Sequence, residues 1–285
     1  MDMCATMGTD SATAASIFQK IDDVLSLYGI SGRKRVGFGV DNTNVNLGSR
    51  NSIMTRVKER SPSCYFMGCP CHLIHNIACK ASEAFCDTSK FSLEDMRVDT
   101  YYYFDKSTKR KSLSVEFADF LDIESCQVIE HVNTRWLSLE TAARRNLDMY
   151  PALKSYFRSN TESNPRFKRL KQQFADPMVE VYHLFFQAGL PTFTFPNKFL
   201  QREDPCIYAA HGQLNEFVRC LLGKFVQIDK IKAAKTVDEV NFEEESQQLK
   251  DGQLFIGFAT RQLLNKLVNK GYIDERKRDQ FYQAR

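Results

Sequence analysis

Long apolar runs are absent from this 285-residue chain. None approaches the ~20 residues that a bilayer-spanning helix requires, so no membrane partner is expected. The N-terminal stretch MDMCATMGTDSATAAS also lacks the basic segment followed by an apolar segment that marks a secretory signal peptide. The sequence therefore predicts a protein of the nucleus or, failing that, of the cytoplasm.

A strong excess of one charge is missing as well. The formal net charge is +4 and the pI is near 8.5, which is well short of the signature of a dedicated nucleic-acid-binding domain. Nine cysteines make an odd number that fits poorly with a complete set of disulfides, so we expect reduced thiols. With 43 % hydrophobic and 26 % charged residues, the composition is that of a folded globular protein.

Hydrophobic periodicity predicts a small α/β segment at the start of the chain. The expected elements are, in order, a helix over 11–29, a strand over 36–40, a helix near 50–59, a strand over 65–67 and a helix over about 71–85. Ser11 or Thr13 can cap the first helix. This alternation is typical of an α/β layer with parallel strands.

The pattern of polar and apolar residues changes after this segment. Residues 91–113 are polar apart from an aromatic cluster, and we expect an irregular connection there, with a helix-loop as the alternative. From residue 114 onward apolar residues recur every three or four positions, which predicts helices, with a solvated loop or frayed helix end over 241–253. The predicted organisation is an α/β segment over 1–90, a connection over 91–113 and a helical domain over 114–285.

A single carboxylate follows the first predicted strand. VGFGV leads into Asp41 and then into an Asn-rich turn without charge. Functional groups collect at the carboxyl ends of parallel strands, where a carboxylate can hold a divalent metal without being buried. Asp41 can equally cap the turn that follows, because aspartate side chains often bond to the backbone two residues on. Both interpretations stay open at this point.

Cysteines and histidines crowd into one short stretch of the sequence. The stretch contains Cys64, Cys69, Cys71, His72, His75 and Cys79. Thiolates and imidazoles at short spacing can build a tetrahedral zinc site, and a helix beginning near Cys71 would place His72, His75 and Cys79 on one face. Zinc sites usually show two separated ligand pairs, so structural residues are the competing interpretation.

Arg135 and Trp136 are candidate nucleic-acid contacts. An aromatic ring can stack on an unstacked base while the guanidinium contacts a phosphate. Trp136 is the only tryptophan of the chain, and a large aromatic side chain is also a common core anchor, so packing is the alternative.

Basic residues occur in four separate stretches, at 33–35, 106–111, 166–171 and 276–278. Each can be a solvated surface, and together they can give weak, salt-sensitive affinity for phosphates. The KSTKRK stretch and an RKR triplet also suit a nuclear localisation signal.

Three segments of this sequence together resemble the hAT superfamily of cut-and-paste DNA transposases and the host proteins derived from them. They are GFGVDNTNVNLGSRNSIMTRVKE, GCPCHLIHNIACKA and VNTRWLSLETAARRNLDMYPALKSYF. The resemblance implies a ribonuclease H-like α/β layer interrupted by a helical insertion domain. It also implies that Asp41 matches the second acid of an Asp-Asp-Glu triad that holds two Mg²⁺ for DNA strand cleavage and transfer. Cys69 and His72 match a pair near the catalytic pocket, and Arg135 with Trp136 match a dipeptide near the processed DNA end.

The other two acids of such a triad have no match in this chain. The segment before the first helix is too short for a strand that bears the first acid, and the sequence ends within the expected insertion, before a third. One carboxylate cannot organise two metal ions, so we expect a truncated, catalytically inactive protein that binds DNA or protein and no small-molecule substrate. Self-association is also expected, because a partial sheet leaves an open edge. The alternatives are part of an active transposase with missing exons and a zinc-stabilised interaction module.

Overall fold

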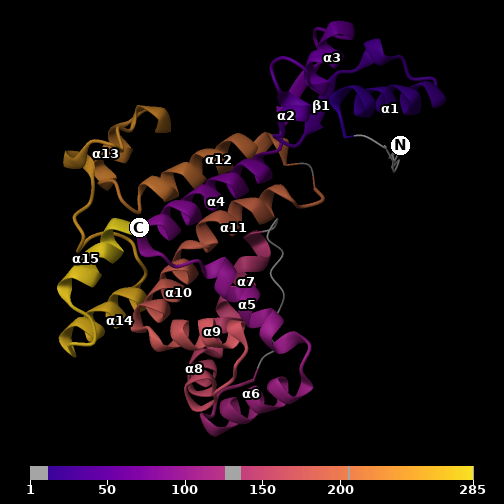
Figure 1. Ribbon diagram of the computed structural model, residues 1–285. Helices are drawn as coiled ribbons and strands as arrows, with labels where there is room; N and C mark the ends of the chain where they lie inside the picture. The colour runs from indigo at the N-terminus through magenta and orange to yellow at the C-terminus, as the bar shows by residue number, and fades with distance from the viewer. Residues whose placement is uncertain (1–11, 126–135, 205, 285) are drawn as a thin grey trace. The chain divides into compact units, whose positions relative to one another are not determined.

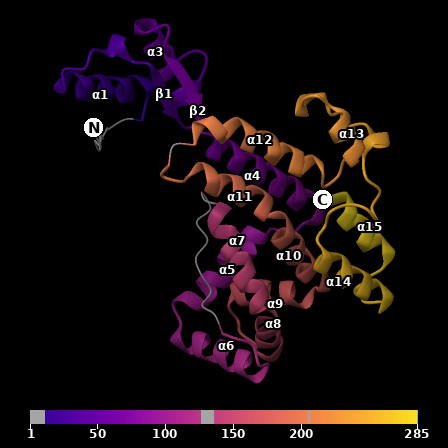
Figure 2. The same ribbon diagram turned by 180° about the vertical axis from the view of Figure 1, so that it is seen from behind.

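The computed structural model describes residues 12–125, 136–204 and 206–284, and its ribbon is drawn in Figure 1 and, from behind, in Figure 2. Helices make up 69 % and strands 4 % of the structure, so the prediction of a mostly helical chain is confirmed. Contacts divide the chain into two compact units, one ending at Asn76 and the other beginning at Ile77. None of the helices in the described ranges is both long and apolar enough to span a bilayer.

The first unit contains the predicted α/β elements. They are α1 (Ala14–Leu27), β1 (Gly37–Val40), α3 (Ile53–Arg60), β2 (Tyr65–Gly68) and the beginning of α4 (Pro70–Ser89). A 3-10 turn (Gly32–Lys34) and the short helix α2 (Asn44–Leu47) are present in addition and were not predicted. β1 and β2 pair in parallel, with Gly37 opposite Tyr65 and Val40 opposite Gly68. The predicted alternation of helices with parallel strands is therefore confirmed.

Short polar residues set the helix boundaries in this unit. Thr13 caps α1, because its side chain accepts a hydrogen bond from the backbone N–H of Ser16. Ser52 and Thr55 form a reciprocal capping box at the start of α3. Of the two caps proposed for the first helix, Thr13 is the one that the structure uses.

One face of the two-stranded sheet carries the core of the first unit. The rings of Phe38 and Phe66 stack with their centroids 5.4 Å apart. They pack against four buried side chains from α1, α3 and the turn before β2, namely Phe18, Ile53, Val57 and Cys64. The opposite face holds Gly37, Gly39, Tyr65 and Met67 and is exposed. One side of the sheet is thus covered by the unit's own helices and the other is not.

The second unit is built of helices. After the remainder of α4 come α5 (Leu93–Asp105), α6 (Thr108–Phe120), α7 (Trp136–Asp148), α8 (Tyr150–Ser159), α9 (Pro165–Ala175), α10 (Pro177–Gly189), α11 (Pro191–Leu200), α12 (Ile207–Leu222), α13 (Ile228–Ala233), α14 (Phe258–Asn269) and α15 (Glu275–Ala284). The stretch 241–253, predicted as a loop, contains one short 3-10 turn, Glu245–Gln247, within the described chain.

The expectation of an irregular connection over 91–113 is wrong, because this segment forms all of α5 and the first part of α6. Ser92 and Ser107 cap the two helices by accepting bonds from the backbone N–H groups of Asp95 and Arg110. Within the aromatic cluster, Tyr103 is only 1 % exposed. The polar composition of the segment hid an apolar helix face that points into the core.

The expected domain boundary at residue 90 is also wrong. The two units meet at Asn76 and Ile77, and α4 is continuous from Pro70 to Ser89 across that point. Phe85 and Phe91 belong to the core cluster of the second unit. Burial of these rings assigns residues 77–113 to the helical unit rather than to the α/β unit.

The core of the helical unit is rich in aromatic rings. Figures 1 and 2 show α5, α7, α9 and α10 near the middle of this unit, with α6 beside α8 and α14 beside α15. Phe157 and Phe174 stack at 5.0 Å between ring centroids, and the hydroxyls of Tyr103 and Tyr156 lie 3.0 Å apart. Fully burying one such ring contributes on the order of 1.5–3 kcal/mol.

Candidate functional site

Asp41 lies directly after β1, at the carboxyl end of the strand. Its Oδ1 atom accepts three hydrogen bonds, from the Thr43 backbone N–H at 3.0 Å, from the Thr43 hydroxyl at 2.7 Å and from the Asn46 side-chain amide at 2.6 Å. These bonds close the turn between β1 and α2. The interpretation of Asp41 as the cap of its turn is therefore confirmed, and Thr43 and Asn46 supply the donors.

The same bonds keep Asp41 ionised. The Thr43 hydroxyl is the largest influence that lowers the pKa of the carboxyl below its usual value, followed by the Thr43 backbone N–H; burial opposes them, and Asn46 and the charge of His72 lower the pKa further. At neutral pH the group is an anion whose Oδ1 atom is already engaged with three donors.

A second set of contacts joins the ends of the two strands. The Asn42 side-chain amide donates to the carbonyl oxygen of Cys69 at 2.9 Å, and the Cys69 N–H donates to the carbonyl oxygen of Val40 at 2.8 Å. Gly68 makes this approach achievable, since a Cβ atom there would lie 2.0 Å from the Asn42 Oδ1 atom. Asp41 and Cys69 are thus brought to one edge of the sheet, as the rule for parallel strands predicts.

His72 lies in the first turn of α4, close enough to Asp41 for its charge to influence the carboxyl pKa. His75 follows one turn later, and the pKa of its ring is lowered by burial and then by the charge of His72. Cys79 comes later on the same helix and belongs to the second unit.

Metal-ligand groupings were sought around these residues. In the ranges that the structure describes, no three His, Cys, Asp or Glu side chains gather in a way that could hold a metal ion. Cys69, His72, His75 and Cys79 therefore do not converge on a zinc site there, and Asp41 is not joined by two further acids as a two-Mg²⁺ triad requires.

The predicted nucleic-acid contacts fall largely outside the described residues. Arg135 lies outside them. Trp136 is the first residue of α7, but its side chain is not among those described. Base stacking and helix packing by Trp136 both stay predictions.

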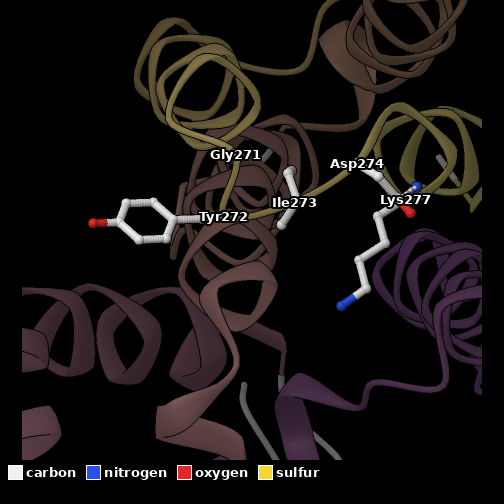
Figure 3. Close-up of a pocket in the computed structure, with 5 residues that line it drawn as sticks. All are labelled: Gly271, Tyr272, Ile273, Asp274 and Lys277. Carbon is white, nitrogen blue, oxygen red and sulfur yellow. Dashed lines mark hydrogen bonds between the residues drawn. The ribbon is translucent and has the colours of Figure 1, made fainter.

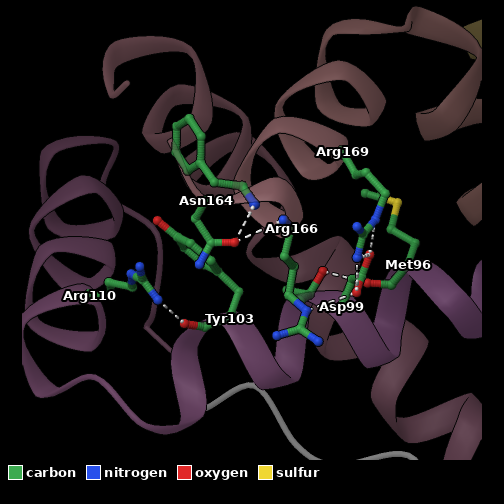
Figure 4. Close-up of polar contacts among 9 residues, drawn as sticks. Met96, Asp99, Tyr103, Arg110, Asn164, Arg166 and Arg169 are labelled. Atoms are coloured by element: carbon green, nitrogen blue, oxygen red, sulfur yellow. Dashed lines mark hydrogen bonds and ion pairs between the residues drawn. The ribbon is translucent and has the colours of Figure 1, made fainter. Parts of the chain in front are cut away.

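The basic stretch at 166–171 is tied into the helical unit by ion pairs. Figure 4 shows two arginines of α9 converging on Asp99 of α5. The Arg166 Nε atom lies 2.9 Å from Asp99 Oδ1, and the Arg169 Nε atom lies 2.9 Å from Asp99 Oδ2. Lys171 of the same helix donates to the carbonyl oxygen of Asn160 at 2.7 Å. Arg166, Arg169 and Lys171 of this basic stretch therefore stabilise the helical unit.

The other basic stretches follow the same pattern. Arg110 donates to Glu162 at 2.8 Å. It also donates to the carbonyl oxygen of Tyr103 at 3.1 Å (Figure 4). Arg35 is paired with Asp22, and Arg278 lies 3.0 Å from the neighbouring acid Asp279. Most of these partners are distant in sequence, which is why the sequence pattern alone did not indicate them.

Two hollows of the surface are lined by residues of the second unit. One, of about 430 Å³, lies between α14 and α15 and is lined by Gly271, Tyr272, Ile273, Asp274 and Lys277. In Figure 3 the Tyr272 ring points away from Lys277, and Asp274 caps α15 by accepting from the Lys277 N–H at 2.8 Å. The other, of about 510 Å³, is lined by Cys79, Ser82, Glu83, Cys86, Asp87, Ser92, Glu94 and Asp95. Neither contains Asp41.

In comparisons of this chain with protein-family models, with curated proteins and with solved structures, nothing matches. The functional argument therefore depends on the residues and their geometry.

Proposed function

We propose that this chain is a catalytically inactive protein of the hAT transposase type, with a partial ribonuclease H-like layer as its first unit, and that it acts by binding. The hydrogen bonding of Asp41 is the observation that supports this proposal. Its Oδ1 atom accepts three hydrogen bonds that close a turn, and among the described residues no two acids join it. Two-metal phosphoryl chemistry needs several converging carboxylate oxygens. The resemblance of the segments around Asp41, Cys69 and Trp136 supports the origin.

DNA is the partner proposed first. Exposed cations such as Lys109, Lys168 and Lys277 remain in the basic stretches, and they suit non-specific contacts with phosphates. Since several arginines of these stretches are engaged in internal ion pairs, few phosphates can be neutralised at once. We therefore expect weak, strongly salt-dependent binding, with a Kd in the range of about 10⁻⁴–10⁻⁶ M at physiological salt. A nuclear location is proposed with it.

A protein partner, or a second copy of the chain, is the second candidate. The uncovered face of the sheet exposes 67 % of Tyr65 and 36 % of Met67. Apolar side chains gathered on an uncovered sheet face favour association with another protein surface. Size-exclusion chromatography over a range of concentrations tests self-association, and a compact monomer throughout would count against it.

The test of the main proposal is a DNA cleavage and binding assay on the 285-residue chain. With Mg²⁺ or Mn²⁺ we expect no strand scission above the metal-only control. Fluorescence anisotropy should show duplex binding that weakens steeply between about 50 and about 200 mM salt. Asp41→Ala should bind equally well, because phosphate contacts come from Lys and Arg. Metal-dependent scission that is lost in Asp41→Ala would overturn the proposal and favour an active transposase.

The zinc alternative has its own readout. Stoichiometric zinc in the purified chain, lost together with thermal stability in Cys69→Ser, would favour a zinc-stabilised interaction module. We expect no such zinc dependence.

A further inference from the structure

The helical unit contains a histidine sealed inside its core. His183 of α10 is 0 % exposed. Its Nδ1 atom lies 2.8 Å from the carbonyl oxygen of Val179, and its Nε2 atom lies 3.0 Å from the side-chain amide nitrogen of Asn146 in α7. A carbonyl oxygen can only accept, so Nδ1 carries the hydrogen and Nε2 accepts from Asn146. The ring is thus a neutral bridge between α7 and α10, which pack against each other.

Asn146 is bonded at one end of its amide only. The residue is 1 % exposed, and its Oδ1 atom is buried without a hydrogen-bond partner. An extra proton on Nε2 would turn that nitrogen into a donor facing the Asn146 N–H group. The amide would then have to rotate by about half a turn for Oδ1 to accept, and its N–H groups would turn away from the ring.

The surroundings of the ring also disfavour a positive charge. Burial is the main reason why the pKa of His183 is lowered to about 4; the bond to Val179 opposes this, and the charge of Arg97 on α5 adds to it. The ring of Tyr150 at the start of α8 lies beside the imidazole, with centroids 5.6 Å apart. Its hydroxyl stays protonated because burial, Glu180 and Asp176 raise its pKa.

Other helices packed on α10 do not compensate a charge at His183. They are α7, α9, α11 and α14. Within the described chain, Arg97 is the one charged side chain that influences the pKa of the ring. A proton on His183 would therefore meet no acid that stabilises it.

We propose that the Asn146–His183 pair is a pH-sensitive contact, which holds α7 and α10 together while His183 is neutral. In mildly acidic solution a proton from the solvent binds Nε2 when the two helices part. The hydrogen bond from Asn146 is then lost, and the imidazolium stays hydrated instead of returning to the core. Acid thus weakens the contact between α7 and α10.

A matched control exists in the same chain. On α12 the Asn215 amide nitrogen lies 2.9 Å from the Nε2 atom of His211, an exposed pair with the same chemistry. Because this pair is exposed and lies within one helix, replacing His211 should leave the acid response of α7 and α10 unchanged.

The test is hydrogen exchange of α7 and α10 amides at about pH 7.5 and about pH 5, corrected for intrinsic exchange rates. Between about pH 7.5 and about pH 5, the equilibrium constant for opening should rise about 30-fold more in the wild type than in His183→Gln. The reason is that protonation of the exposed imidazole, with its ordinary pKa near 6.5, stabilises the open state. His211→Gln should match the wild type. Equal acid responses in the wild type and in His183→Gln would overturn the proposal.

Should His183→Gln fail to fold, two further measurements decide. Asn146→Asp places a carboxylate beside Nε2 and should reduce the acid-induced opening of α7 and α10. In the wild type, the His183 imidazole signal followed by NMR should not titrate between about pH 7 and about pH 5.5. If the imidazole titrates near its ordinary pKa in the folded protein, the proposed pH-sensitive contact is contradicted.

Discussion

A single oxygen atom of Asp41 organises the turn at the end of β1, so we expect this residue to matter for stability more than for chemistry. In Asp41→Asn the donors to Oδ1 lose a charged acceptor, which should lower the free energy of unfolding of the first unit by about 1 kcal/mol at neutral pH. The folded-state pKa of Asp41 lies below its usual value. Its stabilisation is therefore present above the unfolded pKa and is lost as the pH falls through the lowered one.

Hydrogen exchange of the amides of α2, at neutral pH and near pH 3, measures this effect. Asp23→Asn is the control within the same unit, because Asp23 is exposed on α1 and accepts a bond from Gln19 alone. If both variants behave alike, or if the difference between Asp41→Asn and the wild type grows as the pH is lowered, the carboxylate does not hold the turn.

Gly68 is a second residue with a specific steric task. A Cβ atom at this position would meet the Asn42 Oδ1 atom at 2.0 Å, whereas a Cβ atom at Gly39, one strand over, would meet nothing within 4 Å. Gly68→Ala should therefore break the Asn42–Cys69 bond and cost about 1–3 kcal/mol. Gly39→Ala should be neutral or slightly stabilising, because alanine loses less backbone entropy on folding. Urea denaturation of the two variants compares them directly, and similar midpoints would contradict this account.

At the scale of elements, α9 shows how a basic helix can be neutralised from within. Arg166 and Arg169 both bind Asp99, so Asp99→Asn should release two cations for phosphate contacts. Affinity for duplex DNA should rise. The slope of the logarithm of the binding constant against the logarithm of the salt concentration should become steeper by about one to two. The loss of stability should stay near 1 kcal/mol, because these pairs are partly exposed.

Asp119→Asn is the charge-matched control for that experiment. Asp119 lies exposed on α6, and its replacement changes the net charge by the same amount without releasing those arginines. Equal gains in affinity for both variants, measured by fluorescence anisotropy, would mean that net charge alone matters and that the α9 ion pairs do not restrain binding.

The success of sequence reasoning also differs from element to element. β1, β2 and α3 were predictable because apolar runs and turn residues are local signals, and Asp41 was placed at a strand end for the same reason. α5 was missed because its caps and aromatic residues lie in a polar stretch. The Asp99–Arg166 bond joins residues 67 positions apart, and a lone histidine such as His183 carries no sequence signal of burial. Long-range pairing and burial are properties of the tertiary fold.

At the scale of the whole molecule, the two units have separate hydrophobic cores and should unfold separately. Ile53 lies in the core of the first unit and Leu170 in that of the second, and both are nearly fully buried. Replacing either by alanine should cost about 2–5 kcal/mol in its own unit. Hydrogen exchange resolved by segment should then show faster opening of α1 and α3 in Ile53→Ala, and of α8 and α9 in Leu170→Ala.

Because α4 continues from one unit into the other, its amides are the internal reference. Protection should fall in the first part of α4 with Ile53→Ala and in its last part with Leu170→Ala. Uniform loss of protection along the whole chain in either variant would mean that the molecule unfolds as one cooperative body.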